Sequence, residues 1–169
     1  MFFDPESFAQ AFQKLSGDDA ALTAYLEEEF WKLKDARSSG AVCGCCGQST
    51  CRVEEDDVAW QKNRLQGQLT VGGELANCYC KSRAWDKCFA LYDELETLLR
   101  GAGLEETEAY ACVLLNRAYA EMEHGETEHA LELARDVESR LDKADSTDAG
   151  VRRMLRELIA TGEKLEQKS

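Results

Sequence analysis

One helical hairpin occurs twice in this chain, and the duplication constrains the fold more than any other feature of the sequence. The first copy reads GGELANCYCKSRAWDKCFALYDELETLL over residues 72–99, and the second reads LLNRAYAEMEHGETEHALELARDVESRL over residues 114–141. Aligned without a gap, the copies pair Cys88 with Ala130, and every aligned pair is 42 positions apart. A constant offset predicts one supersecondary unit that stacks on its own copy.

Small residues mark the places where helices of the hairpin are expected to cross. Only Ala, Gly, Ser or Cys allows two helix backbones to approach closely. Cys88, Ala118 and Ala130 are therefore predicted to be almost fully buried. One more step of 42 from Ala118 reaches Ala160, inside the apolar-periodic segment RRMLRELIATGEKL. That segment reads as a degenerate third unit.

These residues resemble the tetratricopeptide repeat (TPR), in the long variant found in kinesin light chains and many bacterial proteins. The resemblance covers residues 67–169, and the first copy departs from the pattern at the turn, where Ser82-Arg83 stands in place of Gly. It implies a right-handed stack of antiparallel helical hairpins. The second copy supplies Asn116, Ala118, Gly125, Ala130 and Val137, and the first supplies Ala76, Tyr79, Trp85, Cys88, Tyr92 and Leu95.

The composition independently favours an all-α protein. Pro occurs once, at position 5, and Ala, Leu, Glu, Lys and Arg dominate the sequence. These residues have the highest helix propensities, while β-branched residues are sparse. We expect about seven helices.

The hydrophobic pattern divides the chain into three segments of a single compact domain. Residues 1–37 predict an N-terminal helical hairpin, 38–54 a loop rich in Cys and Gly, and 55–169 the TPR-like repeats. Glycines interrupt the helical pattern after the loop. Gly67 and Gly72-Gly73 predict a bend or a break between residues 60 and 75.

Charge and hydropathy limit the classes of partner. The net charge of −13 argues against nucleic acid, whose binding requires neutralised phosphates, and against anionic membranes. The N-terminus MFFDPESF lacks the basic region and apolar run of a signal peptide. No stretch approaches the roughly 18 apolar residues of a spanning helix. We therefore expect a cytoplasmic protein, in which cysteines stay reduced.

Four cysteines fall within nine residues of the loop: Cys43, Cys45, Cys46 and Cys51. Four thiolates suit a tetrahedral zinc ion, and neighbouring glycines let a loop wrap closely around one. The spacing differs from that of the well-known zinc modules, which use two separated Cys-x-x-Cys pairs. The alternative is a loop with exposed thiols and no cofactor. The sequence therefore predicts no cofactor, and it leaves open zinc or another thiophilic ion at this loop.

The remaining cysteines do not predict catalysis. Cys88 occupies a small-residue position of the repeat, and Cys78 and Cys80 point to different faces of a helix. A nucleophilic cysteine needs a base, and the two histidines, His124 and His129, flank a hairpin turn. We therefore expect a protein that is not an enzyme.

The TPR resemblance implies that the first helix of each hairpin lines a concave surface that receives extended peptides. An Asn side chain on this surface can both donate to and accept from a peptide backbone. For Asn116, a structural bond to a neighbouring helix is an equally open alternative. The residues predicted to bind peptide are Asn77, Cys80, Asn116, Tyr119 and Met122.

Chaperone-tail-binding relatives clamp a terminal carboxylate with two lysines and an arginine. Gly73, Met154 and Leu158 stand at those places here, so the resemblance does not extend to the carboxylate clamp. Two functions from different classes follow. The first is a non-catalytic protein- or peptide-binding scaffold, and the alternative is a thiol-based zinc or redox sensor that uses the cysteine loop. Incomplete repeat arrays can also self-associate through an uncapped apolar face, which would give a homo-oligomer.

Overall fold

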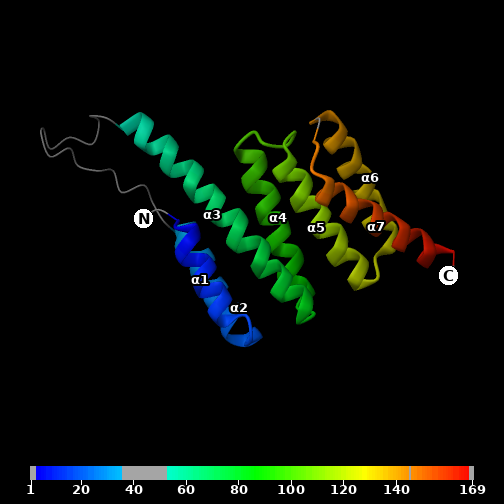
Figure 1. Ribbon diagram of the computed structural model, residues 1–169, viewed down its shortest axis with the longest axis horizontal. Coiled ribbons are helices and arrows are strands. Elements are labelled where there is room, and N and C mark those ends of the chain that lie inside the picture. Colours follow the sequence, from blue (N-terminus) through cyan, green and yellow to red (C-terminus); the bar gives the residue numbers. More distant parts are fainter. Residues whose placement is uncertain (1–2, 36–52, 145, 168–169) are drawn as a thin grey trace, which may run out of the picture. The chain divides into compact units, whose positions relative to one another are not determined.

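Seven α-helices and no strand occur in the residues that the computed structural model describes, 3–35, 53–144 and 146–167 (Figure 1). Side chains of the second range are described from residue 58 onward. The prediction of an all-α protein with about seven helices is confirmed. No helix in these ranges is long and apolar enough to cross a membrane. The helices are α1 (Pro5–Leu15), α2 (Asp19–Asp35), α3 (Val53–Lys81), α4 (Trp85–Gly101), α5 (Glu108–His124), α6 (Thr127–Lys143) and α7 (Ala149–Glu166).

The chain forms two compact units, residues 1–75 and 76–169, and the boundary between them lies inside α3. The sequence predicts one domain whose repeats begin at residue 55, so the second unit begins 21 residues later than the predicted repeats. Each unit is described by itself below. The four cysteines of the predicted loop lie outside the described residues.

The first unit begins with a helix whose start is fixed by its sequence. Asp4 is the N-cap of α1, and its carboxylate accepts a hydrogen bond from the Glu6 amide at 3.0 Å. The next helix, α2, buries one stripe of apolar side chains. At its C-terminal end, Arg64 donates to the carbonyls of Leu33 and Lys34 at 2.8 and 2.6 Å. The buried stripe consists of Leu22, Leu26, Phe30 and Leu33.

Of the bend or break predicted between residues 60 and 75, the break is wrong, because α3 is one continuous helix from Val53 to Lys81. Gly67 serves close packing instead. A Cβ atom on Gly67 would lie 2.7 Å from Cγ of Phe3 and 3.1 Å from Cδ1 of Leu33. The missing side chain therefore leaves room for an aromatic ring, at the modest cost of Gly inside a helix.

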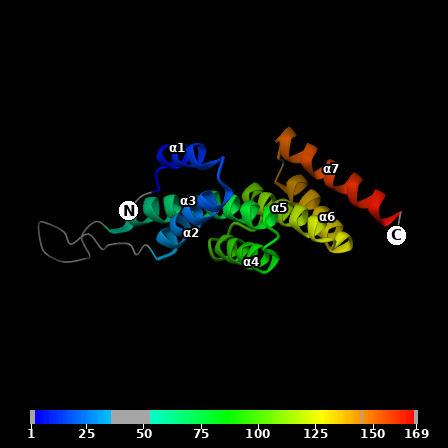
Figure 2. The same ribbon diagram turned by 90° about the horizontal axis from the view of Figure 1, so that it is seen from below.

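In the second unit, consecutive helices pack against one another in the manner of a repeat stack. Contacts join α4 to α5, α5 to α6 and α6 to α7, and α7 also touches α5 (Figure 1, Figure 2). The helices α4 and α6 begin 42 residues apart, at Trp85 and Thr127. They also end 42 residues apart, at Gly101 and Lys143. The offset read from the sequence is thus an offset between equivalent helices.

The predicted burial of the small residues is confirmed. Cys88, Ala118 and Ala130 are each 0% exposed. The Cys88 thiol donates to the Ala76 carbonyl at 3.5 Å, which joins α4 to the last turns of α3. Ala76 is itself fully buried. Such complete burial is what a close helix crossing at these positions requires.

Candidate functional site

A cavity of about 240 Å³ opens in the second unit and is lined by side chains from four helices. We name it the asparagine cavity. Four of the five residues predicted to bind peptide line it, although they come from segments almost 40 residues apart in sequence. The lining residues are Asn77 and Cys80 from α3, Tyr92 from α4, Asn116, Tyr119, Ala120 and Glu123 from α5, and Met154 from α7.

Helical spacing places these side chains on common faces. Asn77 and Cys80 are three residues apart on α3, one turn from each other. Asn116, Tyr119 and Glu123 follow the spacing i, i+3, i+7 on α5, so they form one stripe along that helix. The duplicated hairpin packs the two helices so that both faces border one cavity.

The two asparagine amides are available for a ligand. Neither the Asn77 nor the Asn116 side chain forms a hydrogen bond with any residue that the structure describes. Asn77 is exposed and Asn116 is half-buried. No hydrogen bond in the described part of the chain therefore supports the alternative, in which Asn116 bonds a neighbouring helix. The exposed Asn77 amide is accessible to a ligand, and the half-buried Asn116 amide lacks the partner that buried amides normally have.

Tyr119 contributes its ring to the asparagine cavity, but its hydroxyl is engaged elsewhere. The hydroxyl donates to the Met154 carbonyl at 2.8 Å, which ties α5 to α7 at one side of the cavity. Burial raises the pKa of Tyr119, and the Glu157 carboxylate adds to the effect. The phenol is thus a neutral donor in a structural bond.

Tyr92 lines the cavity although the sequence analysis did not place it there. It is 1% exposed, and burial raises its pKa above the ordinary range of a tyrosine. The duplicated hairpin contains a signal that could have drawn attention to Tyr92. Tyr92 pairs with Ala134 at the offset of 42, so a large side chain stands where the other copy has a small, fully buried one.

The remaining polar groups of the cavity are a thiol and a carboxylate. Burial raises the pKa of Cys80, and the nearby Glu123 carboxylate raises it further. The thiol is therefore protonated near neutral pH and is a poor nucleophile. Glu123 is exposed, and it forms no ion pair within the described ranges. This set of groups is suited to hydrogen bonding and to charge recognition.

Met122 lies outside the asparagine cavity, unlike the other four predicted residues. A Cβ atom on Gly162 would be 2.9 Å from Cε of Met122, so this thioether packs against α7. Along α5, position 122 is rotated away from the stripe that contains Asn116 and Tyr119. Its flexible side chain fills the space that Gly162 leaves.

An ion-pair network joins α4 to α5 and was not foreseen from the sequence. Arg117 lies 2.6 Å from the Glu96 carboxylate, 2.7 Å from Asp93 and 3.5 Å from Glu121. Glu96 and Glu121 are buried, and Arg100 lies 2.7 Å from Glu96. The spacing of four residues in Glu96–Arg100 and Arg117–Glu121 is visible in the sequence, whereas the pairing across helices depends on the fold.

The described residues contain no cluster of three or more His, Cys, Asp or Glu that could hold a metal ion. Zinc at Cys43, Cys45, Cys46 and Cys51 stays a prediction, since those residues lie outside the described ranges. Among the described cysteines, Cys80, Cys88 and Cys112 are free thiols, and Cys78 is buried.

Both histidines have partners other than these thiols. The His124 ring packs 5.1 Å from the Trp85 ring and 5.4 Å from the Phe89 ring. Nδ1 of His129 lies 3.3 Å from the Glu121 carboxylate. The two imidazoles therefore take part in an aromatic cluster and in the Arg117 network.

Comparisons of this chain with protein-family models, with curated proteins and with solved structures found no match. The similarity to TPR proteins accordingly remains a resemblance of residues. The function is argued from the asparagine cavity itself.

Proposed function

We propose that this protein is a non-catalytic binding module that holds an extended peptide in the asparagine cavity, as a TPR-like scaffold or adaptor. One observation carries the proposal. Asn77 and Asn116, chosen from the repeat register, meet at one cavity with their amides unbonded to any described residue. Paired amides of this kind suit the capture of a peptide backbone, because each offers a donor and an acceptor.

The other walls of the cavity indicate the character of the peptide. Ala120, Met154 and the Tyr119 ring provide an apolar surface, and a thioether adapts to side chains of different shape. Glu123 supplies the one carboxylate among the lining residues. A peptide that carries a basic residue near this carboxylate would associate faster at low salt than at high salt.

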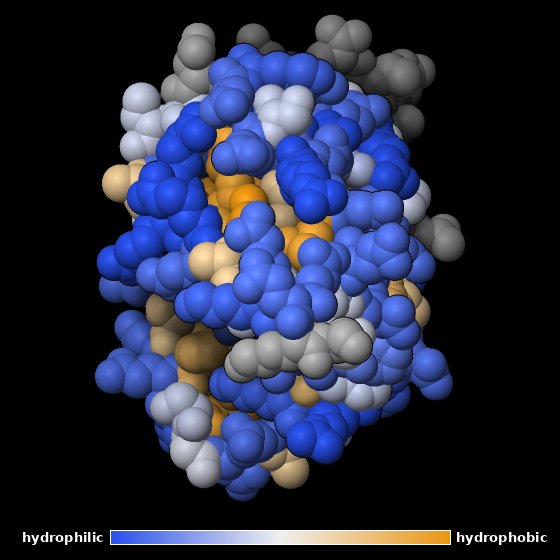
Figure 3. Space-filling view, turned by 90° about the vertical axis from the view of Figure 1, so that its right-hand side faces the viewer, coloured by the Kyte–Doolittle hydropathy of each residue, from blue (hydrophilic) through white to orange (hydrophobic). Residues whose placement is uncertain are grey.

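The hydrophilicity of the surrounding surface supports a local site rather than a broad apolar interface. Figure 3 shows the face at the α7 side, where hydrophilic side chains cover most of the surface and the most apolar residues in view lie in small hollows between them. Recognition on such a face depends on the few polar groups that converge in a recess.

The experiment is a selection of short random peptides on the immobilised full-length protein, followed by titration of the recovered peptides. The double variant Asn77→Ala/Asn116→Ala should bind them about tenfold more weakly or worse, because it loses two backbone-directed amides. Its thermal melt should match that of the wild type, since neither amide is bonded in the described structure.

The matched control removes two exposed amides from α1, in the variant Gln10→Ala/Gln13→Ala. This control should bind peptide as the wild type does. If the asparagine variant unfolds, or binds peptide with unchanged affinity, the amides are not the recognition groups and the proposal fails.

A further inference from the structure

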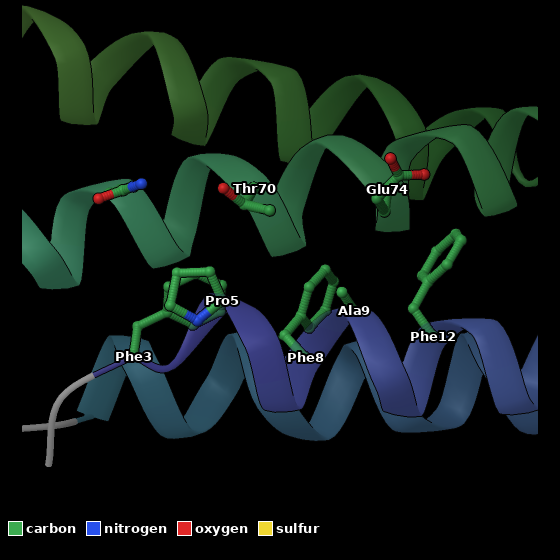
Figure 4. A pocket seen from close by; sticks show the side chains of 8 residues that line it. Phe3, Pro5, Phe8, Ala9, Phe12, Thr70 and Glu74 are labelled. Carbon is green, nitrogen blue, oxygen red and sulfur yellow. The ribbon is translucent and has the colours of Figure 1, made fainter.

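A second cavity, of about 310 Å³, lies in the first unit between α1 and α3. We name it the aromatic cavity. Figure 4 shows its two walls, with Phe8 and Phe12 pointing from α1 toward the helix that contains Thr70 and Glu74. One wall is apolar and the other polar. The lining residues are Phe3, Pro5, Phe8, Ala9 and Phe12 on the first wall, and Gln66, Thr70 and Glu74 on the second.

The aromatic wall is held in place although α1 itself has no fully buried residue. Phe3 is anchored through its backbone, which donates to Oδ1 of Asn63 at 2.6 Å and accepts from its Nδ2 at 3.0 Å. The Phe8 ring then lies 5.6 Å from the Phe3 ring and 6.0 Å from the Phe12 ring. Phe8 and Phe12 are only half-buried. A row of rings therefore borders open space rather than a packed core.

The polar wall carries a single charge. Glu74 is the one charged residue among the eight that line the aromatic cavity, and it forms no ion pair with any residue in the described part of the chain. A purely apolar ligand would remove water from this carboxylate without replacing it, which is unfavourable. An anion would be repelled. A cation with an apolar body satisfies both walls, because aromatic faces also attract cations.

We propose that the aromatic cavity binds a small organic ammonium ion, with the ammonium group beside Glu74 and the apolar body against Phe8 and Phe12. The volume lies at the low end of the range for small-molecule sites, about 300–1,000 Å³, so the ligand is compact. This site is separate in sequence and in composition from the asparagine cavity. It stands whether or not that cavity binds peptide.

Calorimetric titration of the full-length protein with three probes of similar shape tests the proposal. The probes are phenethylammonium, the neutral phenethyl alcohol and the anion 3-phenylpropanoate. The ammonium ion should bind about tenfold more tightly than the alcohol, and the anion should not bind. In the variant Glu74→Gln, which keeps the shape and removes the charge, the ammonium ion and the alcohol should bind alike.

Two further variants separate this site from its alternatives. Phe12→Leu keeps an apolar wall but removes a ring, so it should weaken the binding of the ammonium ion more than the binding of the alcohol. Glu123→Gln removes a lining carboxylate from the other cavity and should leave ammonium binding unchanged. Circular dichroism establishes that each variant is folded.

Three outcomes would overturn the proposal: equal binding of the three probes, an affinity for the ammonium ion that is unchanged in Glu74→Gln, or the absence of any binding. A capped peptide with one lysine serves as a fourth probe. If it binds as tightly as phenethylammonium, the ligand is a protein side chain, and the assignment to a small molecule is wrong.

Discussion

Arg83 and Gly125 occupy the same position in two copies of one turn, and both have left-handed backbones, with φ of 57° and 101°. They are 42 residues apart. The Arg83 amide donates to the Cys80 carbonyl at 3.0 Å, and the Gly125 amide donates to the Met122 carbonyl at 3.1 Å. These two acceptors are again 42 residues apart. The turn is therefore copied in geometry at the point where its sequence departs from the pattern.

Replacing Arg83 by glycine should stabilise the protein. A non-glycine residue in the left-handed region is strained by roughly 1–2 kcal/mol, and glycine relieves this strain at the cost of a more flexible unfolded chain. We expect Arg83→Gly to raise the free energy of unfolding by about 0.5 kcal/mol, measured by urea denaturation. The control Arg83→Ala loses the same charge but keeps the strain, so it should bring no gain. Equal gains in both variants would trace the effect to charge and not to the backbone.

Enlarging a helix crossing should destabilise the second unit. Ala118 and Ala130 are completely buried, so leucine at either position has no space and should cost about 1–3 kcal/mol. Ala109 is exposed near the start of α5 and provides the matched control. Ala109→Leu should change the melting temperature little. If both leucine variants at the buried positions melted at the wild-type temperature, these positions would not be close helix crossings.

Removing Arg117 should leave two buried carboxylates without their shared partner. Glu96 retains its contact with Arg100, and Glu121 retains its contact with His129. Arg117→Met should therefore lower the free energy of unfolding by about 3 kcal/mol, at the lower end for a broken buried pair. Arg100 is itself 54% exposed, and its replacement by methionine should cost less than about 1 kcal/mol. Urea denaturation of both variants gives the comparison. If both variants lost similar free energy of unfolding, the ion pairs of Arg117 would contribute no more than an exposed ion pair does.

Cys88 should make the fold sensitive to alkaline pH. Burial raises the pKa of Cys88 to about 12 from an ordinary value of 9.0. As pH rises, the unfolded chain releases this proton first, so the stabilisation is complete below pH 9 and is lost between pH 9 and 12. The variant Cys88→Ala has alanine, as at the equivalent position 130, and it has no thiol whose ionisation could change the stability. Its stability should decline less than that of the wild type in this range, and parallel declines would contradict the burial of the thiol.

The sequence was informative wherever a short-range rule decides the structure. The offset of 42 located the crossings at Cys88, Ala118 and Ala130, and the stripe along α5 followed from helical spacing. Other features depend on side chains brought together from distant segments. Gly67 predicted a break because glycine is a poor helix former, but the ring of Phe3 lies against it, and no local rule contains that contact.

The composition of the asparagine cavity was predicted less completely than the fold. Asn77 and Asn116 could be chosen from the repeat register, yet Met122 packs against Gly162 instead of lining the cavity. Tyr92 lines it from a position that the small, buried Ala134 occupies in the other copy. Which side chain turns inward at such positions is decided by the sizes of its neighbours, and these become known only when the helices are packed.

The most direct test of the central claim observes the two asparagines themselves. The side-chain amide signals of Asn77 and Asn116 can be followed by nuclear magnetic resonance during titration with a peptide recovered from the random library. If the asparagine cavity holds the peptide backbone, both signals shift together with the backbone signal of Glu123, along one saturation curve. If the peptide binds while these signals stay unchanged, the peptide is held elsewhere and the proposed function is wrong.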